Sequence, residues 1–150
     1  MKHKINLIAI VDTLEYLKKG GRISKTIAFA GELLAIKPVI SVVSGEVKVI
    51  GKARGSKNAK NLLNQMIMEK GGINFSLPFG AVYSGLSTLM LDKYIEDHRF
   101  VWEPYVDSVP TYIVGSTIGT HVGPGVLGVA FFFCMFMKEK KAEHKEEKDK

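Results

Sequence analysis

The chain has 150 residues, of which 46% are hydrophobic, so it is long enough and apolar enough to fold as one domain around a core. This composition excludes a disordered chain, and a single cysteine, Cys134, excludes a disulfide framework and indicates a reducing cytosol. The net charge is +6, with the excess in residues 1–60, but charge alone does not choose between nucleic acid, a phosphate-bearing partner, an acidic protein and a solvated lysine surface.

The N-terminal third of the sequence begins with a strand and continues with helices. Residues 5–11 are apolar and rich in branched side chains, which predicts a buried strand. The run Asp12-Thr13-Leu14-Glu15 has the form of a capping box and predicts a short helix through Lys19, ended by Gly20-Gly21. Ser24 is placed to cap a second helix, which Pro38 would stop.

The next segment predicts a hairpin followed by an amphipathic helix. Residues 39–43 and 47–50 are strand-like and flank the turn Ser44-Gly45-Glu46, which is typical of a β-hairpin. Ser56 is placed to cap a helix over residues 57–70 whose apolar side chains share one face.

The remaining residues mix strands with one helix and end in a charged tail. We expect strands over 79–83, 100–105, 111–114 and 127–133, and a helix over 86–97. Because the hairpin requires an antiparallel pair and the elements lack a strict βαβ rhythm, the sequence predicts an α+β fold. In this fold a mixed, largely antiparallel sheet packs against helices in a two-layer domain over residues 1–137. Residues 138–150 form a charged tail, as a solvated helix or a disordered end.

A membrane span is not expected. The most hydrophobic stretch, residues 122–137, contains Pro124 and three glycines. It is also shorter than the roughly 20 residues that a helix needs to cross a bilayer.

Three glycine-containing loops carry a side chain that is, or can become, cationic, which is how anion sites are built. In the first, Gly20 to Ser24, the Arg22 guanidinium offers a planar donor fork to a carboxylate or phosphate. In the second, Arg54 and Gly55 precede Ser56, the expected cap of the helix over residues 57–70. For each loop the alternative is a solvent-facing helix end with a surface arginine.

The third loop, Gly119 to Gly125, holds Thr120 and His121 in a turn constrained by three glycines and a proline. His121 could donate to an anion, act as an acid or base, or contact a partner, although a lone histidine in a turn more often does none of these. The four histidines lack cysteines or carboxylates at ligand spacing, so no metal site is predicted. Glycine patterns typical of nucleotide cofactors do not occur either, and no cofactor is expected.

Four motifs in order resemble the C-terminal half of the DegV family of fatty-acid-binding proteins. They are Leu14 to Ile23 (LEYLKKGGRI), Ile36-Lys37-Pro38, Arg54 to Lys57 (RGSK) and Gly119 to Gly125 (GTHVGPG), and the similarity runs from about residue 5 to 133. Each motif alone is weak, whereas four at compatible spacings are specific.

This resemblance implies a cytoplasmic bacterial protein of two domains that encloses one long-chain fatty acid and is not itself an enzyme. It presents the carboxylate to a separate fatty acid kinase, which forms an acyl phosphate for phospholipid synthesis. By analogy, Arg22 and Ser24 lie near the carboxylate, while Arg54, Thr120 and His121 lie at the mouth where the kinase docks. The N-terminal domain, whose hydroxyls normally hold the carboxylate, is absent from this sequence and is expected as a partner in the same or another chain.

Two other functions stay open at this stage. In one, His121 serves as acid or base in a small hydrolase, together with Thr120 or Ser116. In the other, the chain is an interaction module without a ligand and docks through the basic surface that includes Arg54. DNA binding ranks lowest, because lysine-rich charge without clustered aromatics gives only generic attraction.

Overall fold

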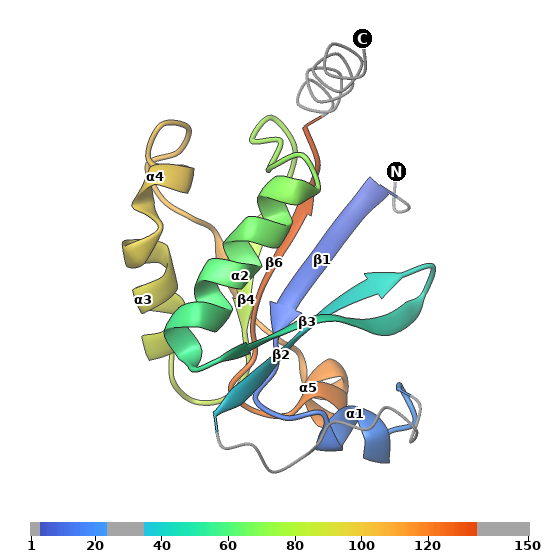
Figure 1. Cartoon of the computed structure of the whole chain (residues 1–150). Helices are drawn as coiled ribbons and strands as arrows, with labels where there is room; N and C mark the ends of the chain where they lie inside the picture. Colours follow the sequence, from blue (N-terminus) through green and yellow to red (C-terminus); the bar gives the residue numbers. More distant parts are fainter. Residues whose placement is uncertain (1–3, 24–34, 135–150) are drawn as a thin grey trace, which may run out of the picture.

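The computed structural model describes residues 4–23 and 35–134. Within these ranges six strands form one mixed sheet in the order β3-β2-β1-β6-β4-β5 (Figure 1). All neighbouring strands run antiparallel except β4 and β5, which are parallel. The strands are β1 (Ile5–Ile10), β2 (Ile36–Val43), β3 (Glu46–Arg54), β4 (Gly80–Tyr83), β5 (Thr111–Ile113) and β6 (Leu127–Phe132).

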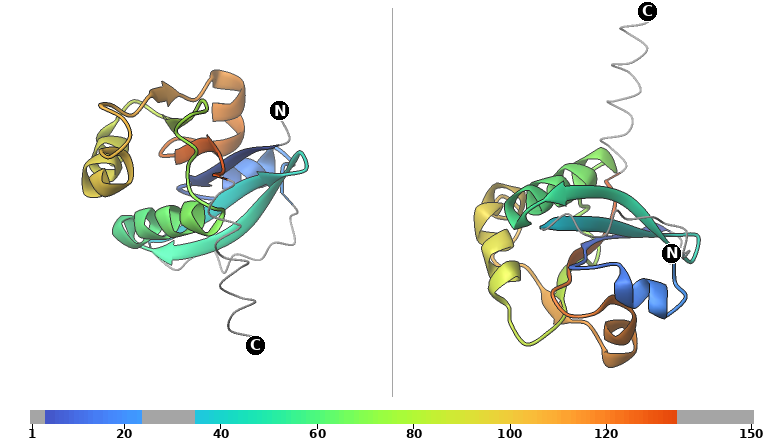
Figure 2. Two further views of the ribbon diagram at one scale, coloured as in Figure 1. Left: turned by 90° about the horizontal axis from the view of Figure 1, so that it is seen from above. Right: turned by 60° about the horizontal axis from the view of Figure 1, so that its bottom comes forward.

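Five helices accompany the sheet in the described part of the chain. Helix α2 lies across one face of the sheet with α3 and α4 beside it, whereas α1 and α5 lie together near one end of the strands (Figures 1 and 2). The α+β fold and the largely antiparallel sheet are therefore confirmed. The helices are α1 (Glu15–Lys19), α2 (Ser56–Glu69), α3 (Leu89–Asp97), α4 (Arg99–Trp102) and α5 (Ser116–Val122).

Strand β1 lies inside the sheet, and its second half is buried on both faces. Ile8 and Ile10 point into the larger core, which α2 covers through Leu63. The intervening Ala9 and the following Val11 belong to a second core that includes Leu17 of α1. Because successive strand residues point to opposite faces, one short apolar strand ties both cores together, and each fully buried Ile or Leu contributes about 1.5–3 kcal/mol.

The predicted hairpin is confirmed and is longer than the sequence indicated. Ser44 and Gly45 connect β2 to β3, and both have positive φ angles, 52° and 82°, as a tight two-residue hairpin turn requires. Pro38 ends no helix: it lies inside β2, opposite Lys52. The sheet tolerates a residue without an N–H here because the register between β2 and β3 shifts next to it, between Val39 and Ile40.

Helices α1, α2 and α3 differ from the prediction in the residue at which they begin or in the residue that caps them. Helix α1 begins at Glu15, and Asp12 forms an ion pair with Lys37 in place of a helix cap. In α2 the capping position is Gly55, with a φ of 79°, and Ser56 is the first helical residue. Helix α3 begins at Leu89 rather than at residue 86.

The strand predicted over residues 100–105 is wrong, because this segment begins with helix α4 and ends in a turn. The Val101 N–H donates to the His98 carbonyl and the Glu103 N–H to the Arg99 carbonyl, both at 2.9 Å. Trp102 is buried while Phe100 is 68% exposed. The bulky apolar residues predict a strand, but the backbone hydrogen bonds of this segment close helical turns instead.

The helix expected after Ser24 and the charged tail lie largely or wholly outside the described residues. Among the described residues, none of the helices combines the length and apolar character that a bilayer crossing needs.

Candidate functional site

The first glycine loop ends α1 and directs Arg22 to the surface. Gly20 closes the helix and Gly21 follows with a φ of 69°. This turn lets the Arg22 N–H donate to the Leu17 carbonyl at 2.8 Å. The Arg22 Nη1 donates back to the Gly20 carbonyl oxygen at 2.7 Å. One edge of the exposed guanidinium is thereby fixed, and the rest of its donor fork has no acidic partner among the described residues.

The third glycine loop is a helix in its first half, so Thr120 and His121 lie on α5 and not in a turn. The imidazole of His121 packs directly against Gly20. A Cβ atom on Gly20 would lie 2.4 Å from His121 Nδ1, a distance that real side chains do not tolerate. His121 Nδ1 is also buried and has no hydrogen-bond partner among the described residues. Gly20 thus lies against both the Arg22 guanidinium and the His121 imidazole, although Arg22 and His121 are 99 residues apart in the sequence.

A second contact of the same kind runs in the opposite direction. The ring of Tyr16, on α1, packs against Gly123, which follows α5, and a Cβ on Gly123 would lie 2.4 Å from Tyr16 Cδ2. Each helix therefore contributes an aromatic ring to a glycine of the other. We call the set Tyr16, Gly20, Arg22, His121 and Gly123 the α1–α5 junction.

Ser84 fixes the loop that leads out of this junction, although it belongs to none of the motifs that the sequence analysis selected. It directly follows β4 and is 6% exposed. Its Oγ donates to the Gly123 carbonyl at 2.6 Å and accepts from the Val126 N–H at 3.0 Å. A serine followed by a glycine after a strand was the only available signal, and it carries little information alone.

The hydroxyl groups near His121 are bonded to the backbone. Thr120 Oγ1 donates to the Ser116 carbonyl one turn earlier on α5, at 2.9 Å. The Ser84 hydroxyl is engaged by Gly123 and Val126. No hydrogen bond joins the hydroxyl of Thr120 or of Ser84 to His121 within the described ranges.

Arg54 stands apart from the junction. It is the last residue of β3, opposite Ile36, and its side chain is exposed. Its carbonyl accepts a hydrogen bond from Asn58 Nδ2 at 2.9 Å. In the described structure no hydrogen bond or ion pair connects it with Arg22 or His121. Ser24, predicted beside Arg22, lies outside the described residues.

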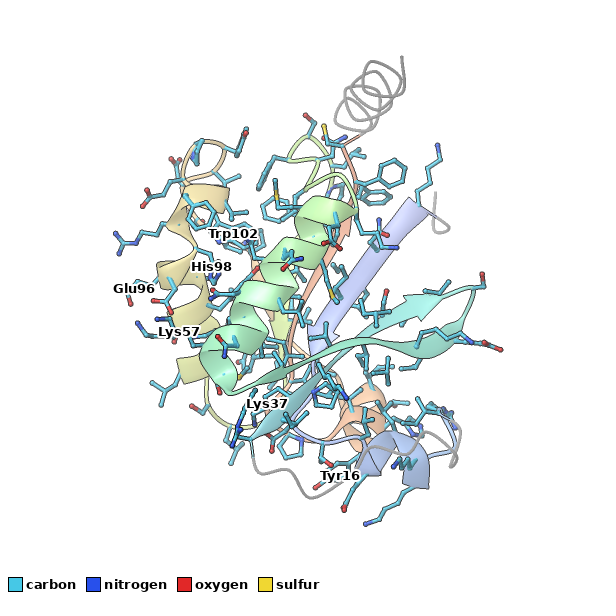
Figure 3. The ribbon with its side chains drawn as sticks, viewed as in Figure 1. Tyr16, Lys37, Lys57, Glu96, His98 and Trp102 are labelled. Atoms are coloured by element: carbon cyan, nitrogen blue, oxygen red, sulfur yellow. The ribbon has the colours of Figure 1, made fainter. Side chains whose placement is uncertain are left out.

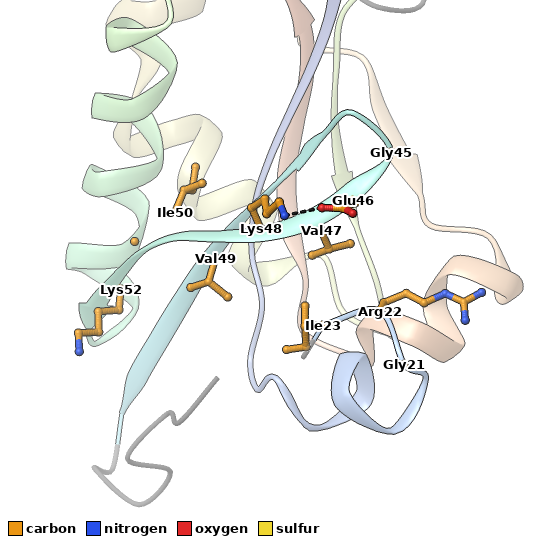
Figure 4. Close-up of a pocket in the computed structure, with 11 residues that line it drawn as sticks. Gly21, Arg22, Ile23, Gly45, Glu46, Val47, Lys48, Val49, Ile50 and Lys52 are labelled. Atoms are coloured by element: carbon orange, nitrogen blue, oxygen red, sulfur yellow. Dashed lines mark hydrogen bonds and ion pairs between the residues drawn. The ribbon is translucent and has the colours of Figure 1, made fainter. Parts of the chain in front are cut away.

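A groove of about 1040 Å³ runs between the Arg22 loop and β3 (Figure 4). Ile23 points toward Val47 of the strand, and these two side chains belong to the second core, whereas Arg22 extends away from the strand. The polar rim of the groove includes the ion pair between Lys48 and Glu46, which lowers the pKa of the Glu46 carboxyl.

A smaller, apolar cavity of about 380 Å³ lies near the far end of β6, where Asn74 N–H donates to the Phe132 carbonyl. Its walls come from the end of α2, the segment after it, α4 and Cys134. Phe75 and Tyr105 stack there with ring centroids 4.5 Å apart. Strand β6 separates this cavity from the junction by roughly 20 Å, at about 3.3 Å per strand residue. The aliphatic and aromatic residues of the lining are Met68, Ile73, Phe75, Phe100, Val101 and Tyr105.

Aromatic rings continue from this cavity into the core. Trp102 lies 6.4 Å from Phe75 and 6.0 Å from Tyr94, in both cases edge to face. Burial raises the pKa of the Tyr94 hydroxyl far above its usual range. Tyr94 Oη and Trp102 Nε1 are buried and without hydrogen-bond partners among the described residues. This interior is therefore apolar in character even where its side chains carry polar atoms.

Large apolar side chains are exposed around β5 and the junction. Leu86 and Leu89, in the segment after Ser84, are 108% and 77% exposed. All three residues of β5, an edge strand, are exposed. Exposed apolar side chains of this size are typical of a contact face for another domain or protein. The set consists of Leu86, Leu89, Tyr112, Ile113 and Ile118.

The fold and the junction define a class of α+β domain with a mixed sheet. In this class the glycine-containing ends of two helices, here α1 and α5, pack against each other beside a histidine, here His121. The chain matches the uncharacterised protein family DegV over residues 1–133, and it belongs to that family. The family expectation from the four motifs is thereby confirmed.

Relatives and solved structures agree with this assignment. A DegV domain-containing protein of Clostridium acetobutylicum is 33% identical over 137 residues, covering 86% of this chain and 44% of the relative. A DegV lipid-binding protein of Thermotoga maritima is 26% identical with a TM-score of 0.67, covering 86% of this chain and 43% of that structure. A fatty-acid-binding DegV family protein of Thermus thermophilus is 28% identical with a TM-score of 0.65, covering 87% and 46%. The chain thus spans less than half the length of these relatives.

Proposed function

We propose that this chain forms one half of a binding site for a long-chain fatty acid and presents the carboxylate of that fatty acid to a fatty acid kinase. The observation that carries the proposal is the contact of His121 with Gly20, which brings the imidazole next to the Arg22 loop. Family membership and the lipid-binding relatives from Thermotoga and Thermus support it. The proposal assigns the transfer chemistry to the kinase and none to this chain.

A fatty acid needs an apolar site for its chain and charge-assisted donors for its carboxylate. The aromatic cavity and the α1–α5 junction, near opposite ends of β6, offer one of these each. Each CH₂ group taken from water into an apolar site contributes about 0.8 kcal/mol, so an apolar interior can supply most of the affinity. The aromatic cavity around Phe75 and Tyr105 offers such an interior. A buried carboxylate, by contrast, needs charge-assisted donors, because unpaired burial would cost several kcal/mol. Arg22 has free donors for this purpose, and His121 has an unpartnered Nδ1.

The exposed apolar set around β5 supports a second body that completes the site. We propose that the part of the relatives not covered by this chain, in the same polypeptide or a separate one, docks on Leu86, Leu89 and Ile118. Such contact would bury side chains that are now between 58% and 108% exposed. It would also close the junction from solvent, which strengthens every interaction between Arg22 and a carboxylate.

The proposed mouth for the kinase includes Arg54, Thr120 and His121. Arg54 has an exposed side chain without an acidic partner in the described structure, which suits an acidic partner surface. The exposed backbone-bonded Thr120 lies beside His121 on α5. Electrostatic attraction of this kind mainly raises the association rate and weakens as salt is added.

The fatty acid is tested by organic extraction and mass spectrometry of the full chain. The chain is purified alone and together with the complementary half of the Clostridium acetobutylicum relative. We expect an acyl species in the combined sample. Binding of a fluorescent fatty acid then measures the effect of Arg22→Gln, which should weaken affinity by about 1.5–3 kcal/mol, as loss of a hydrogen bond to a charged group does.

Lys19→Gln is the matched control, because Lys19 is exposed on the same helix end and carries the same charge. It should leave fatty acid affinity unchanged. If neither sample yields an acyl species, or if both variants bind as tightly as the original chain, the fatty acid proposal fails.

Docking of the kinase is tested by a pull-down, in which this chain and the complementary half of the Clostridium acetobutylicum relative together capture a bacterial fatty acid kinase. Arg54→Glu should reduce the captured kinase, while Lys70→Glu, an equal charge change at the far end of α2, should not. Capture that is equal for both variants would exclude Arg54 from the docking surface.

A further inference from the structure

A third cavity, of about 510 Å³, lies between α2 and α3, and it is lined by charged groups. Lys57, Lys60 and Asn61 come from α2, and Lys93, Asp97 and His98 from α3 and its end. Lys57 and His98 lie where these helices face each other (Figure 3). The volume falls within the range of roughly 300–1,000 Å³ that is common for small-molecule sites.

The positive charge in this cavity exceeds the negative charge. Asp97 is the single acid in the lining, and it serves two ammonium groups: Lys93 Nζ lies 2.8 Å from Oδ1 and Lys60 Nζ lies 3.3 Å from Oδ2. Lys57 has no acidic partner among the described residues. With His98 neutral, three lysines and one aspartate leave a charge of +2 on the lining.

Lys60 makes this excess unusual, because its side chain is 7% exposed. A buried ammonium group is normally balanced by an anion of its own, since removal from water is costly. Here the available carboxylate is shared with Lys93, so Lys60 receives only part of a counter-charge. His98, 5% exposed, forms another part of the wall, and its Nδ1 lies 3.0 Å from the Tyr94 carbonyl oxygen. This carbonyl accepts only, so Nδ1 carries the hydrogen.

The position of the lysines on α2 points the same way. The first turn of α2 contains no acidic residue, yet Lys57 is its second residue and Lys60 its fifth. The N-terminal end of a helix is the positive end of its dipole, so cations there are disfavoured and anions favoured. A helix that collects lysines at this end gains from an external anion. Glu96, close by on α3, lies 3.9 Å from Arg99 and also attracts Lys93, but it does not line the cavity.

We propose that this cavity binds a phosphate-bearing anion through Lys57, Lys60 and Lys93. A phosphate monoester carries a charge of about −1.5 to −2 near neutral pH, which balances the excess on the lining. Lysine ammonium groups are established phosphate donors. The site is independent of the fatty acid proposed above, since none of its lining residues belongs to the α1–α5 junction. The cavity leaves room for an organic group beside the phosphate.

The experiment titrates the full chain with inorganic phosphate and, separately, with glycerol 3-phosphate, at constant ionic strength set with chloride. Amide ¹H–¹⁵N NMR spectra report the position of binding. We expect saturable shifts in residues 56–61 and 93–98. Lys57→Gln and Lys93→Gln should each weaken affinity about tenfold, the effect of losing one hydrogen bond to a charged group. The Lys57 side chain is exposed and the Lys93 side chain is 61% exposed, so the fold should persist in both variants.

Lys70→Gln is the matched control, because it removes the same charge from the opposite end of α2. It should leave the affinity unchanged. Tighter binding of glycerol 3-phosphate would identify a phosphorylated molecule as the ligand, and equal binding would identify free phosphate. The proposal is overturned if neither probe gives saturable shifts, or if Lys70→Gln weakens binding as much as Lys57→Gln.

Discussion

His121 occupies the space that a side chain on Gly20 would need, since a Cβ there would lie 2.4 Å from its Nδ1. Gly20 itself has an ordinary φ of −79°, so the glycine is required by the neighbouring imidazole and not by the backbone. This relationship gives a direct way to displace His121 without changing it.

Gly20→Ala should therefore push His121 out of its position. Overpacking of this kind costs about 1–3 kcal/mol of unfolding free energy. Gly119→Ala is the control, because Gly119 lies in α5 with open space around it and alanine favours a helix by about 0.5–1 kcal/mol. Urea unfolding of the two variants measures the difference, and equal stability would contradict the observed contact.

Ser84→Ala should destabilise the loop that follows α5. Its removal leaves the Gly123 carbonyl and the Val126 N–H without their buried partner, at about 1–3 kcal/mol. Ser108→Ala, at an exposed serine, should stay within about 0.5 kcal/mol of the original chain. Thermal unfolding compares them, and a loss no larger at Ser84 than at Ser108 would remove its positioning role.

The stability of the chain should fall in acid partly through Asp97. The hydrogen bond from Lys93 is the main cause that holds the pKa of this carboxyl below its usual range, and Lys60 adds to it. Because the folded pKa lies below the unfolded value of about 3.9, the pairing stabilises the fold above that pH and is lost as pH falls through the folded pKa. Asp97→Asn should thus be less stable near neutral pH, with the difference narrowing below pH of about 4.

Asp107→Asn provides the comparison for this pH series, since Asp107 is exposed and has no ion-pair partner in the described structure. Its stability difference from the original chain should be small at every pH. A difference for Asp97→Asn that is the same in acid as at neutral pH would show that its carboxylate contributes no charge interaction.

The same substitution, leucine to alanine, at the buried Leu63 and at the exposed Leu86 tests which residues belong to the core and which to the proposed contact surface. Leu63→Ala, at a residue with no exposed area, should cost about 2–5 kcal/mol. Leu86→Ala, at a residue that is 108% exposed, should change stability by no more than about 0.5 kcal/mol. Denaturant midpoints measure both. A large loss at Leu86 would mean that this surface is already buried in solution.

The strands and the main helix were predictable because their signals are local. The alternation of Val47 and Val49 with Lys48 predicts a hairpin strand with one buried face, and the apolar face of residues 57–70 predicts α2. Residues 100–105 misled because Phe100, Val101 and Trp102 are all bulky, and only the structure shows that Trp102 is buried while Phe100 is exposed. Pro38 misled because a sheet irregularity beside it removes the usual conflict with a strand.

The candidate site was predictable in part. Glycines beside Arg22 and His121 indicated where backbone and side chain would come close, but not that each glycine faces an aromatic ring of the other loop. That pairing depends on packing between α1 and α5, which lie about 100 residues apart and leave no local pattern. Ser84 escaped prediction for the same reason. The cationic cavity needed the structure as well, because Lys60 and Lys93 meet only across two helices.

The position of β6 has a consequence for how the protein is made. It is the last strand of the described chain, yet it lies in the middle of the sheet and pairs with β1 on one side and β4 on the other. Until residues 127–132 have left the ribosome, the chain holds two separate pieces, β3-β2-β1 and β4-β5, each with an unpaired inner edge. Because exposed edges of nascent sheets invite aggregation and distant pairings form slowly, this domain is most prone to misfolding until β6 has been synthesised and has joined β1 to β4.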